Sequence, residues 1–324
     1  MNRRITAQNA TTIGAFCVAT ALFLFALIYQ PSFGSSNSLS QVAIFAAFMG
    51  IAALGQTLVV LGGGMDLSVP WTIALGGVAF TQWSSSGIPP GVALALVIVA
   101  GVAVGAVNGI GVSYLKVSPI VMTLGVGGIV QAYLLHVGLG SGTGDAAPNL
   151  AQSIATGSVA GIPTLAIFWL VLAVGASLVL SKSAFGRRLY ALGMNERGAY
   201  LAGVRVNQVR ILTYMASGVA SVLAGVVLSG YLGEAFVDMG GPYLFGSIAA
   251  VAVGGASILG GQGSYWGTVA GALTLTFLSS VLSMFDLGQS ALQIAYGLVI
   301  IGGVLFGRVA AGMARSGSRL RRRA

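Results

Sequence analysis

Residues 42–71 read VAIFAAFMGIAALGQTLVVLGGGMDLSVPW, and they carry the clearest structural signal in the chain. Its first part, residues 42–61, is predominantly apolar and holds no charged side chain. A helix needs about 20 such residues to cross a hydrocarbon core of ~30 Å. Three glycines, Asp66 and Pro70 then interrupt the helix before a second apolar run begins. The stretch therefore predicts a membrane-spanning helix followed by a break.

The composition extends this interpretation to the whole chain of 324 residues, which is 56% hydrophobic and only 6% charged. Soluble domains carry roughly 25% charged residues, so a water-soluble globule of this size is excluded. The 50 glycines also fit a membrane protein, because helices in lipid associate by close packing. The single cysteine, Cys17, matches no disulfide or metal pattern and is interpreted as a small lipid-facing or packed residue.

Apolar runs predict about ten transmembrane segments. The third and eighth are too short for ordinary spans. The first segment follows Arg3 and Arg4 and is interpreted as a retained signal-anchor. The segments cover residues 13–29, 42–61, 69–83, 92–112, 120–137, 162–180, 211–232, 243–255, 266–285 and 291–306.

Charge gives an independent test of this topology. With the N-terminus in the cytoplasm and ten alternating segments, all 15 Lys and Arg residues fall on one side, including the tail 308–324. This bias is the positive-inside rule, and it predicts that both termini are cytoplasmic. The net charge of +9 then reports orientation and contact with anionic lipid, and no nucleic acid partner is expected.

The chain also shows an internal duplication. Residues 42–138 and 207–307 each hold four segments. The two groups have opposite orientations in the membrane, and the second segment of each group is short. Each short segment is preceded by an Asp-x-x-x-Pro-aromatic string, Asp66–Trp71 and Asp238–Tyr243. Paired broken helices in two halves are a pointer to a transport site. The predicted fold is an all-α integral membrane protein, one domain over 1–324, with two inverted four-helix repeats plus helices one and six.

The energy source for transport is not in this chain. Neither Lys116 nor Lys182 follows a glycine, so a P-loop is absent. The apolar interiors hold few titratable groups, and a proton route is hard to assemble from Asp66 and His136 alone. Active transport then needs either a separate ATPase or an ion gradient. An ion-coupled secondary carrier for a small neutral solute remains the alternative, and a simple channel is third.

The polar stretch 183–206 mixes helix formers with glycines. Gly193 and Gly203 could bracket a short helix with Asn195 as its N-cap; the alternative is a basic connecting loop. The stretch also carries a pattern made by Gly186, Arg187, Tyr190, Ala191, Gly193, Asn195, Ala199, Leu201 and Gly203. This pattern resembles the coupling segment of ribose-type ABC transporter permeases, from which Gly198 and Val204 depart slightly.

Other blocks resemble the same family, in order, from about residue 40 to residue 307. They are residues 64–69, with Pro70 in place of a family glycine, Asn108–Gly109, residues 119–125 and the glycine-rich residues 249–263.

This resemblance implies a permease subunit of an ATP-driven ABC importer in the bacterial inner membrane. The expected solute is a monosaccharide, a ribose-like pentose or a hexose, although relatives also carry nucleosides, autoinducer sugars or branched-chain amino acids. The resemblance implies three partners: a second permease copy or paralogue, a cytoplasmic ABC ATPase that docks on 183–206, and a periplasmic or lipoprotein sugar-binding protein. The permease itself is expected to be no enzyme and to bind no cofactor, since the ATPase uses ATP and Mg²⁺.

Candidate pore residues follow from the paired strings and the family blocks. Each has a structural alternative. Asp66 could instead cap the third helix, Asn108 and Thr123 could hydrogen-bond between helices, and the two aromatic residues could be interfacial anchors. Gly101, Gly105 and Gly109 recur every four residues and predict a helix-packing face. The candidates are Asp66, Pro70, Trp71, Asn108, Thr123, Pro242 and Tyr243.

Overall fold

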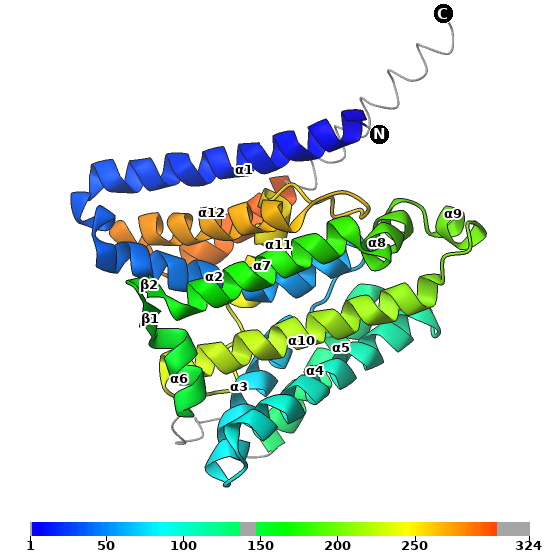
Figure 1. Cartoon of the computed structure of the whole chain (residues 1–324), viewed down its shortest axis with the longest axis horizontal. Coiled ribbons are helices and arrows are strands. Elements are labelled where there is room, and N and C mark those ends of the chain that lie inside the picture. The colour runs from blue at the N-terminus through cyan, green and yellow to red at the C-terminus, as the bar shows by residue number, and fades with distance from the viewer. Residues whose placement is uncertain (1, 137–146, 303–324) are drawn as a thin grey trace, which may run out of the picture.

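The chain folds into a bundle of roughly parallel helices (Figure 1). The computed structural model describes residues 2–136 and 147–302. All ten predicted segments are helical there. The ten are α1 (Asn2–Tyr29), α2 (Ser36–Leu61), α3 (Val69–Ser85), α4 (Pro90–Ser113), α5 (Pro119–His136), α7 (Thr164–Lys182), α10 (Val206–Leu232), α11 (Tyr243–Val253), α12 (Tyr265–Met284) and a last helix, Gln289–Gly302.

The lengths of these helices confirm an all-α integral membrane protein. Within the described residues, 7 helices are long and apolar enough to cross a membrane. The predicted third and eighth segments are indeed short, with 17 residues in α3 and 11 in α11. The tenth segment was predicted to reach residue 306, and its end, like the tail 308–324, lies outside the described residues.

Besides the predicted short helix that follows Asn195, the structure has five short elements that were not predicted, because short helices and hairpins carry little hydropathy signal. A 3₁₀ turn, η1 (Pro31–Gly34), joins α1 to α2. Helix α6 (Asn149–Thr156) and a hairpin of β1 (Ser158–Val159) and β2 (Ile162–Pro163) precede α7. Two helices follow α7, namely α8 (Ala184–Met194) and α9 (Glu196–Leu201). Figure 1 places α6 and the hairpin at one end of the bundle and α8 and α9 at the other; we call these the α6 end and the α9 end.

Helices α2 and α10 form the centre of the bundle. Most of each is buried, whereas α1, α4, α5 and α7 expose most of their surfaces. Since these exposed surfaces are apolar, they suit contact with lipid, where a helix satisfies its own backbone polar groups.

The two predicted groups of four helices interlock. The first helix of each group packs against the second and third helices of the other: α2 against α11 and α12, and α10 against α3 and α4. The packing is thus reciprocal between the two groups, and their relation as inverted copies stays a prediction.

The glycines of α4 form the predicted packing face. A Cβ on Gly101 would lie 2.8 Å from the carbonyl oxygen of Gly218, and one on Gly109 would lie 2.7 Å from Cα of Ile211. A Cβ on Gly105 would overlap the backbone of Tyr214. Helices α4 and α10 therefore touch backbone to backbone, which is how small residues bring helices together in lipid.

Candidate functional site

The α8–α9 segment is built from two capped helices at the α9 end. The Ser183 hydroxyl accepts the Gly186 N–H at 3.1 Å and caps α8, and the Asn195 side chain accepts the Gly198 N–H at 3.0 Å and caps α9. The predicted short helix with Asn195 as N-cap is confirmed, while the role of the segment in coupling stays a prediction.

Helix α9 ends at a Schellman motif. Gly203 has φ +81°, its N–H donates to the Tyr200 carbonyl at 2.9 Å, and the Val204 N–H donates to the Ala199 carbonyl at 3.0 Å. A left-handed residue at this position is usually glycine because it has no Cβ to clash. Both ends of α9 are thus fixed by local bonds that its sequence encodes.

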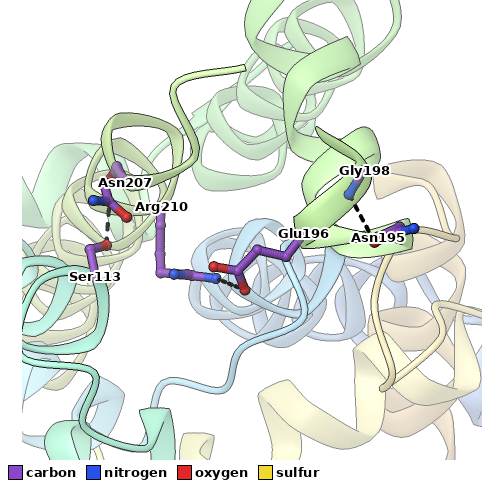
Figure 2. A network of polar contacts seen from close by, with 6 residues as sticks. All are labelled: Ser113, Asn195, Glu196, Gly198, Asn207 and Arg210. Carbon is purple, nitrogen blue, oxygen red and sulfur yellow. Dashed lines mark hydrogen bonds and ion pairs between the residues drawn. The ribbon is translucent and has the colours of Figure 1, made fainter. Parts of the chain in front are cut away.

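Polar contacts tie α9 to the bundle (Figure 2). Arg210, on α10, donates to the Glu196 carboxylate at 2.6 Å. The hydrogen bond from Arg210 lowers the pKa of Glu196 below its ordinary value, assisted by the charges of Arg210 and Lys116 against the cost of burial. Nearby, the Ser113 hydroxyl lies 3.5 Å from the Asn207 carbonyl and links the end of α4 to the start of α10.

The outer face of α9 exposes apolar side chains. Tyr200 is 70% exposed and Leu201 77% exposed. Beside them, a cavity of about 920 Å³ lies between α9, the start of α10 and the α4–α5 turn, and charged residues Lys116, Arg197 and Arg205 are among those that line it. Exposed large apolar residues rimmed by charge are typical of a protein-binding surface.

The inner face of α8 rests on two loops. Tyr190 donates its hydroxyl to the Gly263 carbonyl at 2.8 Å, and burial raises the pKa of this phenol, which keeps it protonated as a donor. Gly193 lies so close to the Leu61 carbonyl and the Gly261 N–H that a Cβ would overlap both. The Gly261 N–H donates to that same carbonyl at 2.9 Å.

Four glycines from three parts of the chain meet at this point, and we call them the glycine junction: Gly63, Gly193, Gly260 and Gly261. A Cβ on Gly260 would lie 2.8 Å from Cα of Gly63 and 3.0 Å from the Gly193 carbonyl oxygen. Gly63, Gly260 and Gly261 also have positive φ, a backbone conformation that favours glycine. The junction joins α8 to the loop after α2 and to the loop after α11.

The loop after α2, residues 62–68, leads from this junction to a buried polar cluster. The Asp66 carboxylate accepts the Ser68 N–H at 3.0 Å, the Ser68 hydroxyl at 2.6 Å and the Ser217 hydroxyl of α10 at 2.7 Å. The Asn108 amide donates to the Ser68 hydroxyl at 2.9 Å, and the Leu67 N–H donates to the Thr123 hydroxyl at 2.9 Å. One loop thus joins α3, α4, α5 and α10.

The two Asp-x-x-x-Pro-aromatic strings meet inside the bundle. A Cβ on Gly240, in the second string, would overlap the backbone carbonyl of Pro70 in the first. Trp71 packs against α5, where a Cβ on Gly127 would lie 2.9 Å from the indole Cδ1. The loop that begins at the α9 end therefore touches the loop that begins at the α6 end.

The predicted pore residues fall into two groups. Asp66, Asn108 and Thr123 belong to the buried cluster and Pro70 and Trp71 lie beside it, while Pro242 and Tyr243 line a separate cavity of about 620 Å³ at the α6 end. Asp66 accepts the N–H of Ser68, the N-cap residue of α3, and a hydroxyl of α10. Asn108 and Thr123 do not bond each other, because each bonds a group of the loop 62–68. All of these contacts are structural. Whether any of these residues meets a solute stays a prediction.

The predicted coupling residues divide between two faces. Arg187, Asn195, Leu201 and Gly203 are exposed, whereas Gly186, Tyr190, Ala191, Gly193 and Ala199 are buried or half-buried against the bundle. The buried partners of the candidate residues were not predicted from the sequence; these are Leu61, Ser68, Ser217 and Gly261. A repeated hydroxyl spacing on α10, Ser217 and Ser221, was the available signal for one of them.

The described residues hold no group of three His, Cys, Asp or Glu side chains that could bind a metal.

The sequence of this chain is similar to those of known transport proteins. Residues 38–309 match a family model described as branched-chain amino acid transport system / permease component. The chain is 34% identical over 305 residues to the ribose import permease protein of Haemophilus influenzae, covering 90% of this chain and 94% of that one. It is 32% identical to the ribose import permease protein of Bacillus subtilis, with 91% and 92% covered.

A third relative, the autoinducer 2 import system permease protein of Salmonella typhimurium, is 32% identical over 95% of this chain and 89% of its own. No solved structure matches the chain.

Proposed function

Since this chain belongs to the family of transport-system permease components, we propose that it is the membrane-spanning subunit of an ATP-driven importer for a monosaccharide, a ribose-like pentose or a hexose. The observation that carries the proposal is the α8–α9 segment. It exposes an apolar pair, Tyr200 and Leu201, on its outer face and fixes its inner face to the glycine junction. A surface of this kind can bind a partner and pass its movement to the bundle.

The partner that would dock there is a cytoplasmic ATPase. ATP and Mg²⁺ would act in that partner, because this chain has no P-loop. Tyr200 and Leu201 would enter a cleft of the ATPase, with Arg197 and Arg205 beside Tyr200. The buried aromatic and apolar anchors of such interfaces carry most of the binding energy, so the arginines would contribute less.

Movement of α8 would reach the interior of the bundle through closely packed backbone contacts. Gly193 touches the end of α2, and residues 62–68 continue from there to the Asp66 cluster. From Pro70 the contact with Gly240 reaches the loop before α11. Closely packed backbones transmit displacement because they cannot be compressed. Alternating access would follow from the tilting of these elements against α2 and α10.

The names of the relatives support the solute class. Two of the relatives are named ribose import permeases and the third is named for autoinducer 2. A substrate-binding protein would deliver the sugar at the α6 end, and a second copy of this chain or a paralogue would complete the pore. The protein would lie in the bacterial inner membrane with both termini and the α9 end in the cytoplasm, as the basic residues favour.

An ion-coupled carrier lacks comparable support. None of the relatives named above is such a carrier. The buried carboxylate of Asp66 is held by three donors from Ser68 and Ser217, an arrangement that a structural role explains.

A reconstitution experiment tests the proposal. The chain would be co-expressed with the ATPase and binding protein encoded beside it and placed in vesicles, where uptake of labelled D-ribose, D-xylose and D-glucose should require ATP. Leu201→Asp should abolish co-purification of the ATPase. Leu287→Asp, an exposed leucine at the α6 end, should leave it intact. Uptake driven by an ion gradient without ATP would contradict the proposal.

A further inference from the structure

A cavity of about 620 Å³ opens at the α6 end between α2, α11, α12 and helix Gln289–Gly302. Its volume falls within the range of roughly 300–1,000 Å³ typical of small-molecule sites. We propose that this cavity binds a neutral, polyhydroxylated solute, and that its uncharged lining excludes zwitterions such as amino acids. The inference rests on the proposed function and adds a place and a selection rule to it.

Hydroxyl groups of α12 line one wall of the cavity and present acceptors. The Thr276 hydroxyl donates to the Ala272 carbonyl at 2.9 Å, the Ser280 hydroxyl to the Thr276 carbonyl at 3.0 Å, and the Ser283 hydroxyl to the Ser279 carbonyl at 2.9 Å. Each hydroxyl has one proton and two lone pairs. Because their protons are held by the helix, these oxygens are left to accept hydrogen bonds. A polyol carries many hydroxyl donors and suits such a wall.

Two phenols face the same cavity from other elements. Tyr243 lies at the start of α11, and Tyr296 belongs to the last helix. Within the described part of the chain, neither hydroxyl has a hydrogen-bond partner. Each can therefore donate to a ring or hydroxyl oxygen of a sugar, while its ring offers an apolar face.

Charge separates this cavity from those at the α9 end. None of the described residues that line it is charged, and its remaining polar members are Gln30, Ser279 and Gln289. The cavity at α9 is lined by Lys116, Glu196, Arg197 and Arg205. A zwitterion would have to leave water without a counter-charge, and burial of an unpaired ion is strongly unfavourable. A sugar loses only hydrogen bonds, which the hydroxyls, phenols and amides can replace.

The cavity is also connected to the coupling path. Pro242 and Tyr243 line it, and Gly240, two residues before, packs on the Pro70 carbonyl. A displacement of the loop before α11 would change the shape of the cavity. The proposed binding site therefore lies at the far end of the chain of contacts that starts at α8.

The test uses the complete transporter in vesicles, with Cys17→Ala and a single new cysteine at Ser280. Modification by a small methanethiosulfonate is timed with the monosaccharide that the wild type takes up from the panel, and with L-leucine. At a sugar concentration ten times its Kd, protection should slow modification about tenfold. L-Leucine should give no protection. Ser86→Cys, an exposed position at the end of α3, should be modified at one rate throughout.

A second variant, Ser280→Phe, fills the cavity. It should stop sugar uptake while the ATPase remains bound and is still stimulated by the loaded binding protein; Ser86→Phe should change neither. Uptake at the wild-type rate by Ser280→Phe, or a Ser280→Cys that sugar does not protect, would overturn the site and leave the proposed function standing. A wild type that imports L-leucine and no sugar would overturn both.

Discussion

Gly193→Ala adds one methyl group at the point where α8 meets the end of α2. The new Cβ would overlap the Leu61 carbonyl and the Gly261 N–H, and both are backbone atoms that cannot rotate away. The end of α8 must then withdraw by something on the order of 1 Å, and overpacking of this kind costs about 1–3 kcal/mol. The hydrogen bond from Gly261 to Leu61, 2.9 Å long, would be strained by the same displacement.

The change leaves the docking face of α9 intact, because Tyr200 and Leu201 lie on its outer side. We therefore expect the ATPase to remain bound while its movement is no longer passed to residues 62–68. The assay is the number of sugar molecules imported per ATP hydrolysed in vesicles, together with ATPase co-purification. The expected result is normal co-purification with a several-fold lower ratio.

Gly175→Ala in α7 is the matched control, since its Cβ would meet nothing within 4 Å. In a helix interior it should be neutral or stabilise by up to about 1 kcal/mol. If Gly193→Ala behaved like Gly175→Ala in both assays, the packing at the junction would not be the route of coupling. Loss of ATPase binding in Gly193→Ala would likewise contradict the assignment of its two faces.

Three further predictions concern the topology of the chain and the stability of α9. In a chain without its native cysteine, an impermeant maleimide should label Ser153→Cys in intact cells and Ser183→Cys only after lysis; the reverse pattern would invert the topology. Asn195→Ala should destabilise α9 by roughly 0.5–2 kcal/mol and weaken ATPase co-purification. Asn195→Asp should change both much less, because Asp is also a good N-cap residue.

Glu196→Gln removes the ion pair with Arg210, which is partly exposed and worth at most about 1 kcal/mol. Because the folded pKa of Glu196 is lowered, the pair stabilises above the unfolded pKa and is lost as pH falls through the folded pKa. Denaturant unfolding should thus separate Glu196→Gln from wild type at neutral pH and not in strong acid, and an equal difference at both would argue against the pair.

The hydropathy of each segment, together with the distribution of charge, was sufficient to predict the ten helices. A span such as α2 is specified by its own composition, so its position needs no knowledge of the rest of the chain. Helix α6 and α8 were missed because they are short, and their stability comes from packing against α10, α7 and the loops. The helix over α9 was predicted because its cap, Asn195, and its terminator, Gly203, are local signals.

The site was harder to predict from the sequence. Asp66, Asn108 and Thr123 were selected singly, and the structure brings them to one loop through Ser68, Ser217 and backbone groups. No periodicity in the sequence indicates which hydroxyl of a distant helix faces a given carboxylate. The junction was invisible for the same reason, since Leu61 contributes only its carbonyl oxygen, which every residue has.

The reciprocal packing of the two halves also governs how the protein can be made. Helix α2 leaves the ribosome early, but its partner α10 begins only at Val206. At about 5–20 residues per second the interval is on the order of ten seconds, during which Asp66 has no Ser217 to bind. The membrane insertion machinery must shelter the first half for that time. We therefore expect truncated chains that stop before α10 to be degraded, and expression to depend on uninterrupted translation between the halves.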